Sequence, residues 1–170
     1  MKHKLTLLIM SILITAGYSQ TVFSPDEPVI QVQKKITTKN TLGGNKISFY
    51  IGKFVDTNGV SKYVRFKYEI LNPNFPPEVF QGYIYDNEFE KLINAVPNLT
   101  KKLTFAEQYP SQYTVSFFYI FDDGTRIGFT KSLNKKINWY IQLNGIIVPI
   151  KNPEILDKIL KQCVQEAKRL

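Results

Sequence analysis

Histidine is almost absent from this chain of 170 residues, in which His3 is the only one. His3 lies in an N-terminal segment that we expect to be cleaved off, so the mature chain has no imidazole. Ser-His-Asp and Cys-His catalysis need an imidazole with a pKa near neutrality, and the common zinc sites need histidines or several cysteines. We therefore predict no catalytic residue of these kinds, no metal ligand and no cofactor.

Cysteine occurs once, at Cys163, so no internal disulfide can form and the core must hold the fold. Cys163 falls on the apolar stripe of a predicted helix, where a thiol without a cationic neighbour keeps a high pKa and stays unreactive. No cysteine follows the N-terminal apolar segment, so we predict no bacterial lipid anchor.

Arginine is also scarce, because Arg65, Arg126 and Arg169 stand against nineteen lysines. Recognition of phosphates and base edges favours the planar guanidinium group, and the lysines are spread along the chain. Although the formal charge of the whole chain is +8, we therefore predict that nucleic acid is not a partner.

The longest apolar run is too short to cross a membrane. It extends over residues 5–16, and a spanning helix needs roughly 20 apolar residues. Lys2 and Lys4 precede this run, and the small residues Gly17 and Ser19 follow it, which is the order of a secretory signal peptide. We predict cleavage after Ser19, no transmembrane segment, and export to the periplasm or the extracellular space. Removal of the two lysines leaves 20 basic and 14 acidic residues, a charge of +6.

The mature chain divides into an N-terminal arm, residues 20–45, and a single globular domain, residues 46–170. The arm contains Pro25 and Pro28, and we expect at most one short strand in it, around residues 29–36. Three hairpins follow from alternating apolar residues around turn dipeptides. They pair residues 47–51 with 64–70, 113–121 with 125–131, and 139–143 with 146–150. Residues 72–77 contain three prolines and are predicted to be a loop, followed by a strand over residues 78–85.

Two helices are predicted. Asn87 and Glu90 have the spacing of a capping box for a first helix, which Pro97 should end or kink. Asn152 caps the second helix and Pro153 occupies its first position, followed by an apolar stripe that begins at Ile155 and runs to Ala167.

These elements predict an α+β fold. We expect one predominantly antiparallel sheet of six or seven strands that carries the C-terminal helix, and the first helix, on its apolar face. Residues 113–121 are apolar on both faces, which predicts a central strand covered on both sides. The order of strands, helix, strands and helix suggests two similar halves, but no single alignment register superposes them, so a duplication is left open.

Carboxylates are the remaining acid–base groups, and two of them would suit a glycosidase if they faced each other across a cleft, with Asp122 and Asp123 as the obvious pair. We favour a structural interpretation, in which Asp123 shapes the turn before Gly124 and the acids near Asp86 stabilise a helix N-terminus. Lys131, Lys135 and Lys136 form the densest basic patch, which is typical of a solvated loop.

Tyrosines give the best indication of a binding site. Five tyrosines fall on strand faces opposite the better apolar stripes or in mixed positions: Tyr50, Tyr63, Tyr83, Tyr85 and Tyr140. Half-buried packing is the commoner outcome for such tyrosines, and a binding face is the alternative. Tyr83 and Tyr85 are the candidate ligand-binding residues. We predict a non-catalytic binding module for an unidentified protein, peptide or glycan. A carboxylate-dependent hydrolase and a structural protein of the cell envelope are the alternatives.

Overall fold

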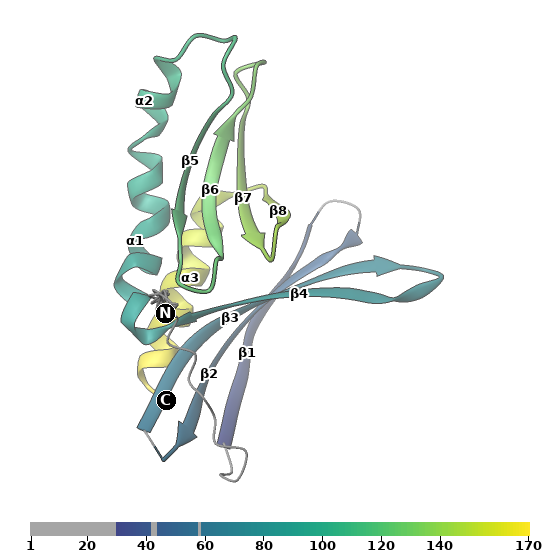
Figure 1. Ribbon diagram of the computed structural model, residues 1–170, viewed down its shortest axis with the longest axis vertical. Coiled ribbons are helices and arrows are strands. Elements are labelled where there is room, and N and C mark those ends of the chain that lie inside the picture. Colours follow the sequence, from purple (N-terminus) through teal and green to yellow (C-terminus); the bar gives the residue numbers. More distant parts are fainter. Residues whose placement is uncertain (1–29, 42–43, 58) are drawn as a thin grey trace, which may run out of the picture.

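The computed structural model describes residues 30–41, 44–57 and 59–170, and folds them into two antiparallel sheets of four strands each. In both sheets every strand pairs with its neighbour in sequence (Figure 1). Sheet 1 contains β1 (Ile30–Asn40), β2 (Lys46–Asp56), β3 (Gly59–Asn72) and β4 (Phe75–Tyr85); sheet 2 contains β5 (Val115–Ile120), β6 (Arg126–Lys131), β7 (Ile137–Leu143) and β8 (Ile146–Ile150).

Helices follow each sheet. The 3-10 turn η2 (Asp86–Glu88), α1 (Phe89–Thr100) and α2 (Leu103–Glu107) come after sheet 1, and α3 (Pro153–Lys168) comes after sheet 2. The α+β class and the antiparallel pairing are confirmed, but the strands number eight and form two sheets instead of one. Each half of the described chain thus has the same order of elements, four strands that pair in sequence and then helix. The sequence indicated this similarity between the halves only weakly.

The helices cross between the halves. Helix α3, from the second half, packs on β2 and β3 of sheet 1, while α1, from the first half, packs on β5 and β6 of sheet 2. The two helices also pack on each other, along one side of the molecule (Figure 1). Phe49 and Phe66 of sheet 1, Phe129 of sheet 2 and Leu160 of α3 therefore belong to one continuous core.

Strand β1 is longer than predicted. The sequence indicated at most a short strand near residues 29–36, whereas β1 runs from Ile30 to Asn40 and pairs with β2 along this length, with one bulge between Lys35 and Thr37. Most of its side chains are exposed, because β1 is an edge strand. Strands that bury little apolar surface lack the hydrophobic alternation on which sequence prediction depends.

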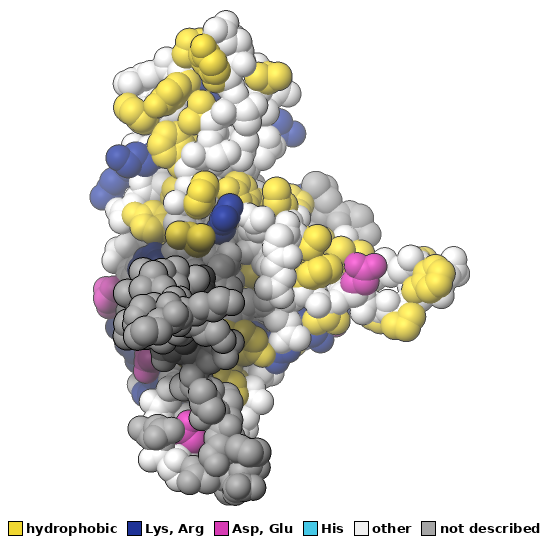
Figure 2. All heavy atoms as spheres, in the orientation of Figure 1, with side chains coloured by type: hydrophobic (Ala, Val, Ile, Leu, Met, Phe, Trp, Pro, Cys, Tyr) yellow, Lys and Arg dark blue, Asp and Glu magenta, His cyan; other side chains and the backbone are white. Residues whose placement is uncertain are grey.

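The proline-rich segment is part of a strand, contrary to the prediction of a loop over residues 72–77. Strand β4 begins at Phe75 and includes Pro76 and Pro77, which fall where the pairing with β3 is irregular, between Ile70 and Asn72. An edge strand tolerates proline because the missing N–H faces away from the ladder. The hairpin tip projects from the fold and bears exposed hydrophobic side chains, with Phe75 68% exposed (Figures 1 and 2).

Helix α1 does not begin or end as predicted. Its N-cap is Glu88, no side chain caps it, and Asn87 lies in η2, so the capping box is absent. The helix also continues through Pro97 to Thr100. Proline removes one hydrogen bond inside a helix, and the buried residues Val96 and Leu99 on either side of Pro97 anchor the last turn in the core.

Strand β5 is an edge strand, so the predicted central position of residues 113–121 is wrong. Phe117 and Tyr119 face the core, but Phe118 and Ile120 on the opposite face are 45% and 48% exposed. Apolar residues on both faces of a strand usually mean two covering layers. Here the described residues cover β5 on one face only.

The other hairpins and the C-terminal helix are confirmed. Strands β2 and β3 pair from Asp56 and Gly59 onwards, and β7 pairs with β8, whose Pro149 lies at the sheet edge. The Asn152 side chain caps α3 by accepting a 3.0 Å hydrogen bond from the Ile155 N–H. Ile155 itself is 44% exposed and does not join the buried stripe.

The predicted signal peptide, residues 1–19, lies outside the described residues, and none of the described helices is long and apolar enough to cross a membrane.

Candidate functional site

Four of the five candidate tyrosines lie on one face of sheet 1, which we call the tyrosine face: Tyr50, Tyr63, Tyr83 and Tyr85. In the strand register Tyr50 is opposite Arg65, Arg65 is opposite Tyr83, and Tyr63 is opposite Tyr85. Residues directly opposite each other on neighbouring strands point to the same side. Helix α3 packs on the other side, where Phe49, Val64 and Phe66 lie in the core.

Tyr63 forms the base of the face and is fully buried. It is paired with Gly52, and a Cβ at Gly52 would lie 2.3 Å from the Tyr63 hydroxyl oxygen, so only glycine leaves room for the ring. The ring is 4.8 Å from Phe54 and 5.5 Å from Tyr83, measured between centroids. The Tyr63 hydroxyl accepts a 2.9 Å hydrogen bond from the Gln31 side chain of β1. These contacts make the base of the face rigid.

Arg65 lies in the middle of the face, between two rings. Its guanidinium carbon is 5.3 Å from the centroid of Tyr50 and 5.7 Å from that of Tyr83. One terminal N–H donates a 2.7 Å hydrogen bond to Gln33 of β1, while the buried Nε has no partner in the described structure. Lys35, 6.0 Å from the Tyr50 ring, adds a second cation. The arrangement therefore presents fixed positive charge between aromatic surfaces.

The two tyrosines selected from the sequence lie at the β4 side of this face. Tyr83 is half-buried, and its hydroxyl donates a 3.1 Å hydrogen bond to Gln81. Tyr85 is 38% exposed. Burial raises the pKa of Tyr85 above its usual value of 10.0, and Tyr83, Asp123 and Tyr63 add to the rise, so Tyr85 is a neutral hydrogen-bonding group at physiological pH.

Tyr140 lies apart from the other four. It is on β7 of sheet 2, opposite Gly128 and Pro149. Burial raises its pKa, and the nearby Arg126 opposes the rise. Tyr140 is therefore a tyrosine of similar burial to Tyr85 that does not belong to the tyrosine face.

The second half of the chain holds β4 in place. The backbone N–H of Tyr83 donates a 2.6 Å hydrogen bond to Oδ2 of Asp123, in the turn between β5 and β6. The same turn passes so close to Gly82 that a Cβ there would lie 2.2 Å from the Thr125 hydroxyl oxygen. The tyrosine face is thus complete only when both halves are assembled.

The acidic residues that the hydrolase alternative would need are engaged in local contacts. Asp123 accepts 2.8 Å hydrogen bonds from the N–H and the hydroxyl of Thr125, and Glu88 accepts a 3.0 Å bond from the Asp122 N–H and pairs with Lys91 at 2.8 Å. These contacts are those of turns and helix starts.

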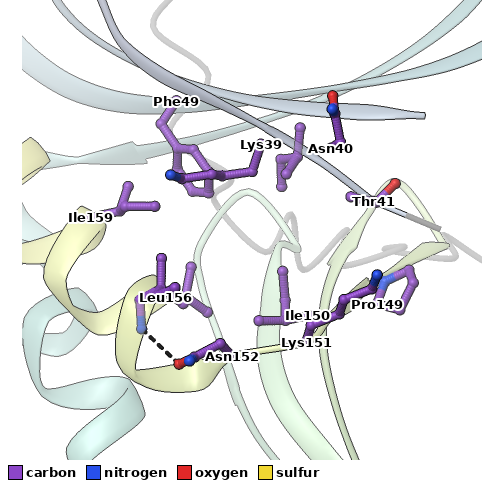
Figure 3. A pocket seen from close by; sticks show the side chains of 12 residues that line it. Lys39, Asn40, Thr41, Phe49, Pro149, Ile150, Lys151, Asn152, Leu156 and Ile159 are labelled. Atoms are coloured by element: carbon purple, nitrogen blue, oxygen red, sulfur yellow. Dashed lines mark hydrogen bonds between the residues drawn. The ribbon is translucent and has the colours of Figure 1, made fainter. Parts of the chain in front are cut away.

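A pocket of about 160 Å³ lies where the halves meet, and we call it the interface pocket. Its twelve lining residues come from β1, β2, β8 and the start of α3 with their flanking segments, and none of the twelve has a carboxylate (Figure 3). Among the described residues no group of three or more His, Cys, Asp or Glu side chains lies close enough together to hold a metal ion. The glycosidase alternative therefore finds no pair of acids in this pocket.

Lys131 and Cys163 are both buried, and neither is available for reaction with a ligand. Lys131, assigned from the sequence to a solvated patch, is only 3% exposed and donates hydrogen bonds of 3.1 Å and 2.6 Å to the carbonyls of Ala106 and Tyr109. The prediction that Lys131 belongs to a solvated patch is therefore wrong, because this lysine caps the C-terminal end of α2. Cys163 is buried in the core, and burial raises the pKa of its thiol from 9.0 to about 12, as expected for an unreactive cysteine.

Sequence reasoning selected Tyr83 and Tyr85 but missed Arg65 and its amide partner Gln33. The signal was present, since the alternation of Val64, Phe66 and Tyr68 with charged residues places Arg65 on the face opposite the core. Comparisons of the chain with known protein families, with curated proteins and with solved structures find no match.

Proposed function

We propose that the protein is an exported, non-catalytic binding module and that the tyrosine face is its binding surface. The observation on which the proposal depends is the position of the Arg65 guanidinium group between the Tyr50 and Tyr83 rings, with one of its terminal N–H groups bonded to Gln33. The terminal N–H groups of Arg65 that Gln33 does not use can donate to a ligand that supplies acceptors. Rigid aromatic side chains provide contact area at low entropic cost.

The groups on the face favour a polymer of sugar rings with carboxylates. Aromatic rings pack against the apolar faces of sugars, and the amides of Gln31, Gln33 and Gln81 offer donors and acceptors for hydroxyls. Arg65 is suited to a carboxylate because its guanidinium group forms planar, charge-assisted hydrogen bonds. Lys35 and Lys67 increase the positive charge, although Lys67 is paired with Glu69 at 2.9 Å. We therefore take the ligand class to be an acidic polysaccharide.

The binding role is also supported by how the acids of this region are used. Asp123 and Glu88 are held by backbone N–H groups, and no histidine lies in the described chain. A ligand on the tyrosine face meets aromatic, amide and cationic groups, while the Glu69 carboxylate on the same side is held in an ion pair with Lys67, so the face is suited to recognition rather than to acid–base chemistry.

Affinity gel electrophoresis tests the proposal. The purified protein is run through native gels that contain polygalacturonate or, for comparison, the neutral polymer dextran. We expect polygalacturonate to retard the protein and dextran to leave it unaffected. Replacement of Tyr83 and Tyr85 together by alanine should weaken the retardation about tenfold, equivalent to about 1.4 kcal/mol.

Tyr140→Ala is the matched control, because Tyr140 is about as buried as Tyr85 but lies on sheet 2. It should be retarded like the parent protein. Thermal unfolding of each variant shows that the fold is retained, and Arg65→Lys, which keeps the charge but removes the planar group, should also bind more weakly. Equal retardation of the parent and the double variant would exclude the tyrosine face as the site.

Export is tested separately. Expression of the full chain in a bacterial host, followed by fractionation and mass spectrometry of the exported form, should give a mature N-terminus at Gln20. Retention of residues 1–19 on a cytoplasmic product would contradict this part of the proposal without bearing on binding.

A further inference from the structure

The interface pocket lies on the core side of sheet 1, away from the tyrosine face. Ile47 and Phe49 of β2, Ile150 of β8, and Leu156 and Ile159 of α3 form its apolar wall (Figure 3). Its volume of about 160 Å³ is close to that of engineered cavities of about 150 Å³ that hold one benzene molecule. The apolar part of an occupant is therefore about the size of one aromatic ring or one branched aliphatic side chain.

Two lysines flank this apolar space. Lys39 approaches from the end of β1 and Lys151 from the segment after β8, so their stems border the pocket from different elements (Figure 3). Neither ammonium group has a hydrogen bond or an ion pair with the described residues, unlike Lys53 and Lys62, which cap the carbonyls of Leu170 and Lys168. With no carboxylate in the lining, the pocket is complementary to a ligand that joins an apolar group to a negative charge.

Strand β1 leads directly to the pocket. Lys39 and Asn40, its last two residues, and Thr41 after them are part of the lining. The strand order places β1 at the edge of sheet 1, where its outer edge pairs with no strand of the described chain. Unpaired backbone groups along an edge accept an added strand. Lys39 is paired with Ile47, so side chains on this side of an added strand point toward the apolar wall.

From these features we infer that the interface pocket binds the C-terminal residue of an extended peptide. The apolar side chain of that residue fills the pocket, its carboxylate lies between Lys39 and Lys151, and the preceding residues pair with the outer edge of β1. Antiparallel pairing of a second copy of this chain through the centre of β1 is disfavoured, because Lys34 and Lys35 of one strand would lie close to the same two lysines of the other.

The inference is tested by fluorescence anisotropy with the purified protein and a labelled hexapeptide, Ser-Thr-Val-Thr-Val-Phe, with a free C-terminal carboxylate. The same peptide ending in an amide keeps the side chain and the backbone but lacks the charge. We expect the amide to bind at least about tenfold more weakly, because a hydrogen bond to a charged group contributes more than one to a neutral group. The free acid 3-phenylpropanoate, which has no backbone to pair with β1, should bind weakly.

Four variants locate the site. Ile155→Trp adds bulk at the rim of the pocket and should abolish binding, whereas Ile147→Trp makes the same change on β8 outside the lining and should not. Lys39→Gln with Lys151→Gln should reduce affinity for the acid to that for the amide. Lys158→Gln, an exposed lysine on α3 that does not line the pocket, controls for overall charge. All five positions are exposed on the surface or partly so, and circular dichroism checks that each variant is folded.

Each outcome is decisive. Equal affinities for acid and amide would show that the lysines do not recognise a carboxylate and would overturn the inference. Binding of 3-phenylpropanoate as tightly as the peptide would show a pocket for small free acids and would remove the role of β1. Binding that survives Ile155→Trp would place the peptide elsewhere, and absence of any binding would contradict the site altogether. The double alanine variant of Tyr83 and Tyr85 should bind the peptide normally, so this result is independent of the proposed function.

Discussion

The backbone N–H of Tyr83 donates a 2.6 Å hydrogen bond to the Asp123 carboxylate, forty residues further along the chain. Tyr83 belongs to the edge strand β4 of sheet 1, whereas Asp123 belongs to the turn between β5 and β6 of sheet 2. One side chain of the second half thus occupies the free edge of the first. Edge strands that remain open invite unwanted pairing, and this contact closes β4 at the tyrosine face.

Replacement of Asp123 by alanine should destabilise the protein by about 2–4 kcal/mol, because it removes the acceptor for Tyr83 and for both donors of Thr125. Urea unfolding followed by tryptophan fluorescence measures the change. Asp122→Ala is the control, since its carboxylate accepts one long hydrogen bond of 3.4 Å, from Asn87. A loss no larger for Asp123→Ala than for Asp122→Ala would show that the contact does not hold the halves together.

Removal of Lys131 should also be costly. Lys131→Ala removes the buried donor to the carbonyls of Ala106 and Tyr109, of which the Ala106 carbonyl keeps the Tyr109 N–H, and we expect a loss of about 2–4 kcal/mol in the free energy of unfolding. Lys136→Ala changes an exposed lysine nearby and should alter stability by about 0.5 kcal/mol or less. If the two variants were equally stable, Lys131 would be the solvated residue that its sequence context indicates.

Much of the fold was predictable where apolar residues alternate strongly. The β2–β3 and β7–β8 hairpins and α3 have clear periodicity, Asn-Gly dipeptides or a cap with proline, and the structure confirms them. Strand β1 was underestimated because its exposed glutamines and lysines give no such pattern. A helix end at Pro97, one of the two outcomes predicted there, was wrong because local preference favours an end, while burial of the neighbouring Val96 and Leu99 favours continuation.

The grouping of the tyrosines was only partly predictable. Alternation alone places Tyr83 and Tyr85 on one face, and the hairpin register adds Tyr50 and Tyr63. The contacts that fix Arg65 depend on Gln33 of β1, a strand that the sequence did not resolve. The exchange of α1 and α3 between the halves could not be foreseen at all, because amphipathic stripes show that a helix packs but not on which sheet.

The exchanged helices predict that neither half folds alone. A fragment of residues 20–114 lacks α3 and leaves Ile47, Phe49 and Val64 uncovered, whereas residues 115–170 lack α1. Each fragment should show poorly dispersed amide signals in NMR spectra, and mixing the two should restore native dispersion. Cooperative unfolding of either isolated fragment would contradict the single core.

Cys163 predicts a loss of stability at alkaline pH. Burial raises the pKa of its thiol to about 12 in the folded state, while the unfolded chain retains the usual value of 9.0. The unfolded state therefore loses its proton first, so the stabilisation is complete below pH 9 and is lost as the pH rises from 9 through 12. Urea unfolding at pH 8 and pH 10.5 should show a smaller decrease for Cys163→Ala than for the parent. Identical decreases would mean that the thiol is not desolvated.

The binding role of the tyrosine face is tested most directly by NMR titration of the labelled protein with trigalacturonate. Our account predicts progressive chemical-shift changes for the backbone amides around Tyr50, Arg65 and Tyr83, with sheet 2 unaffected around Tyr140. Changes confined to sheet 2, or none at saturating ligand, would contradict it.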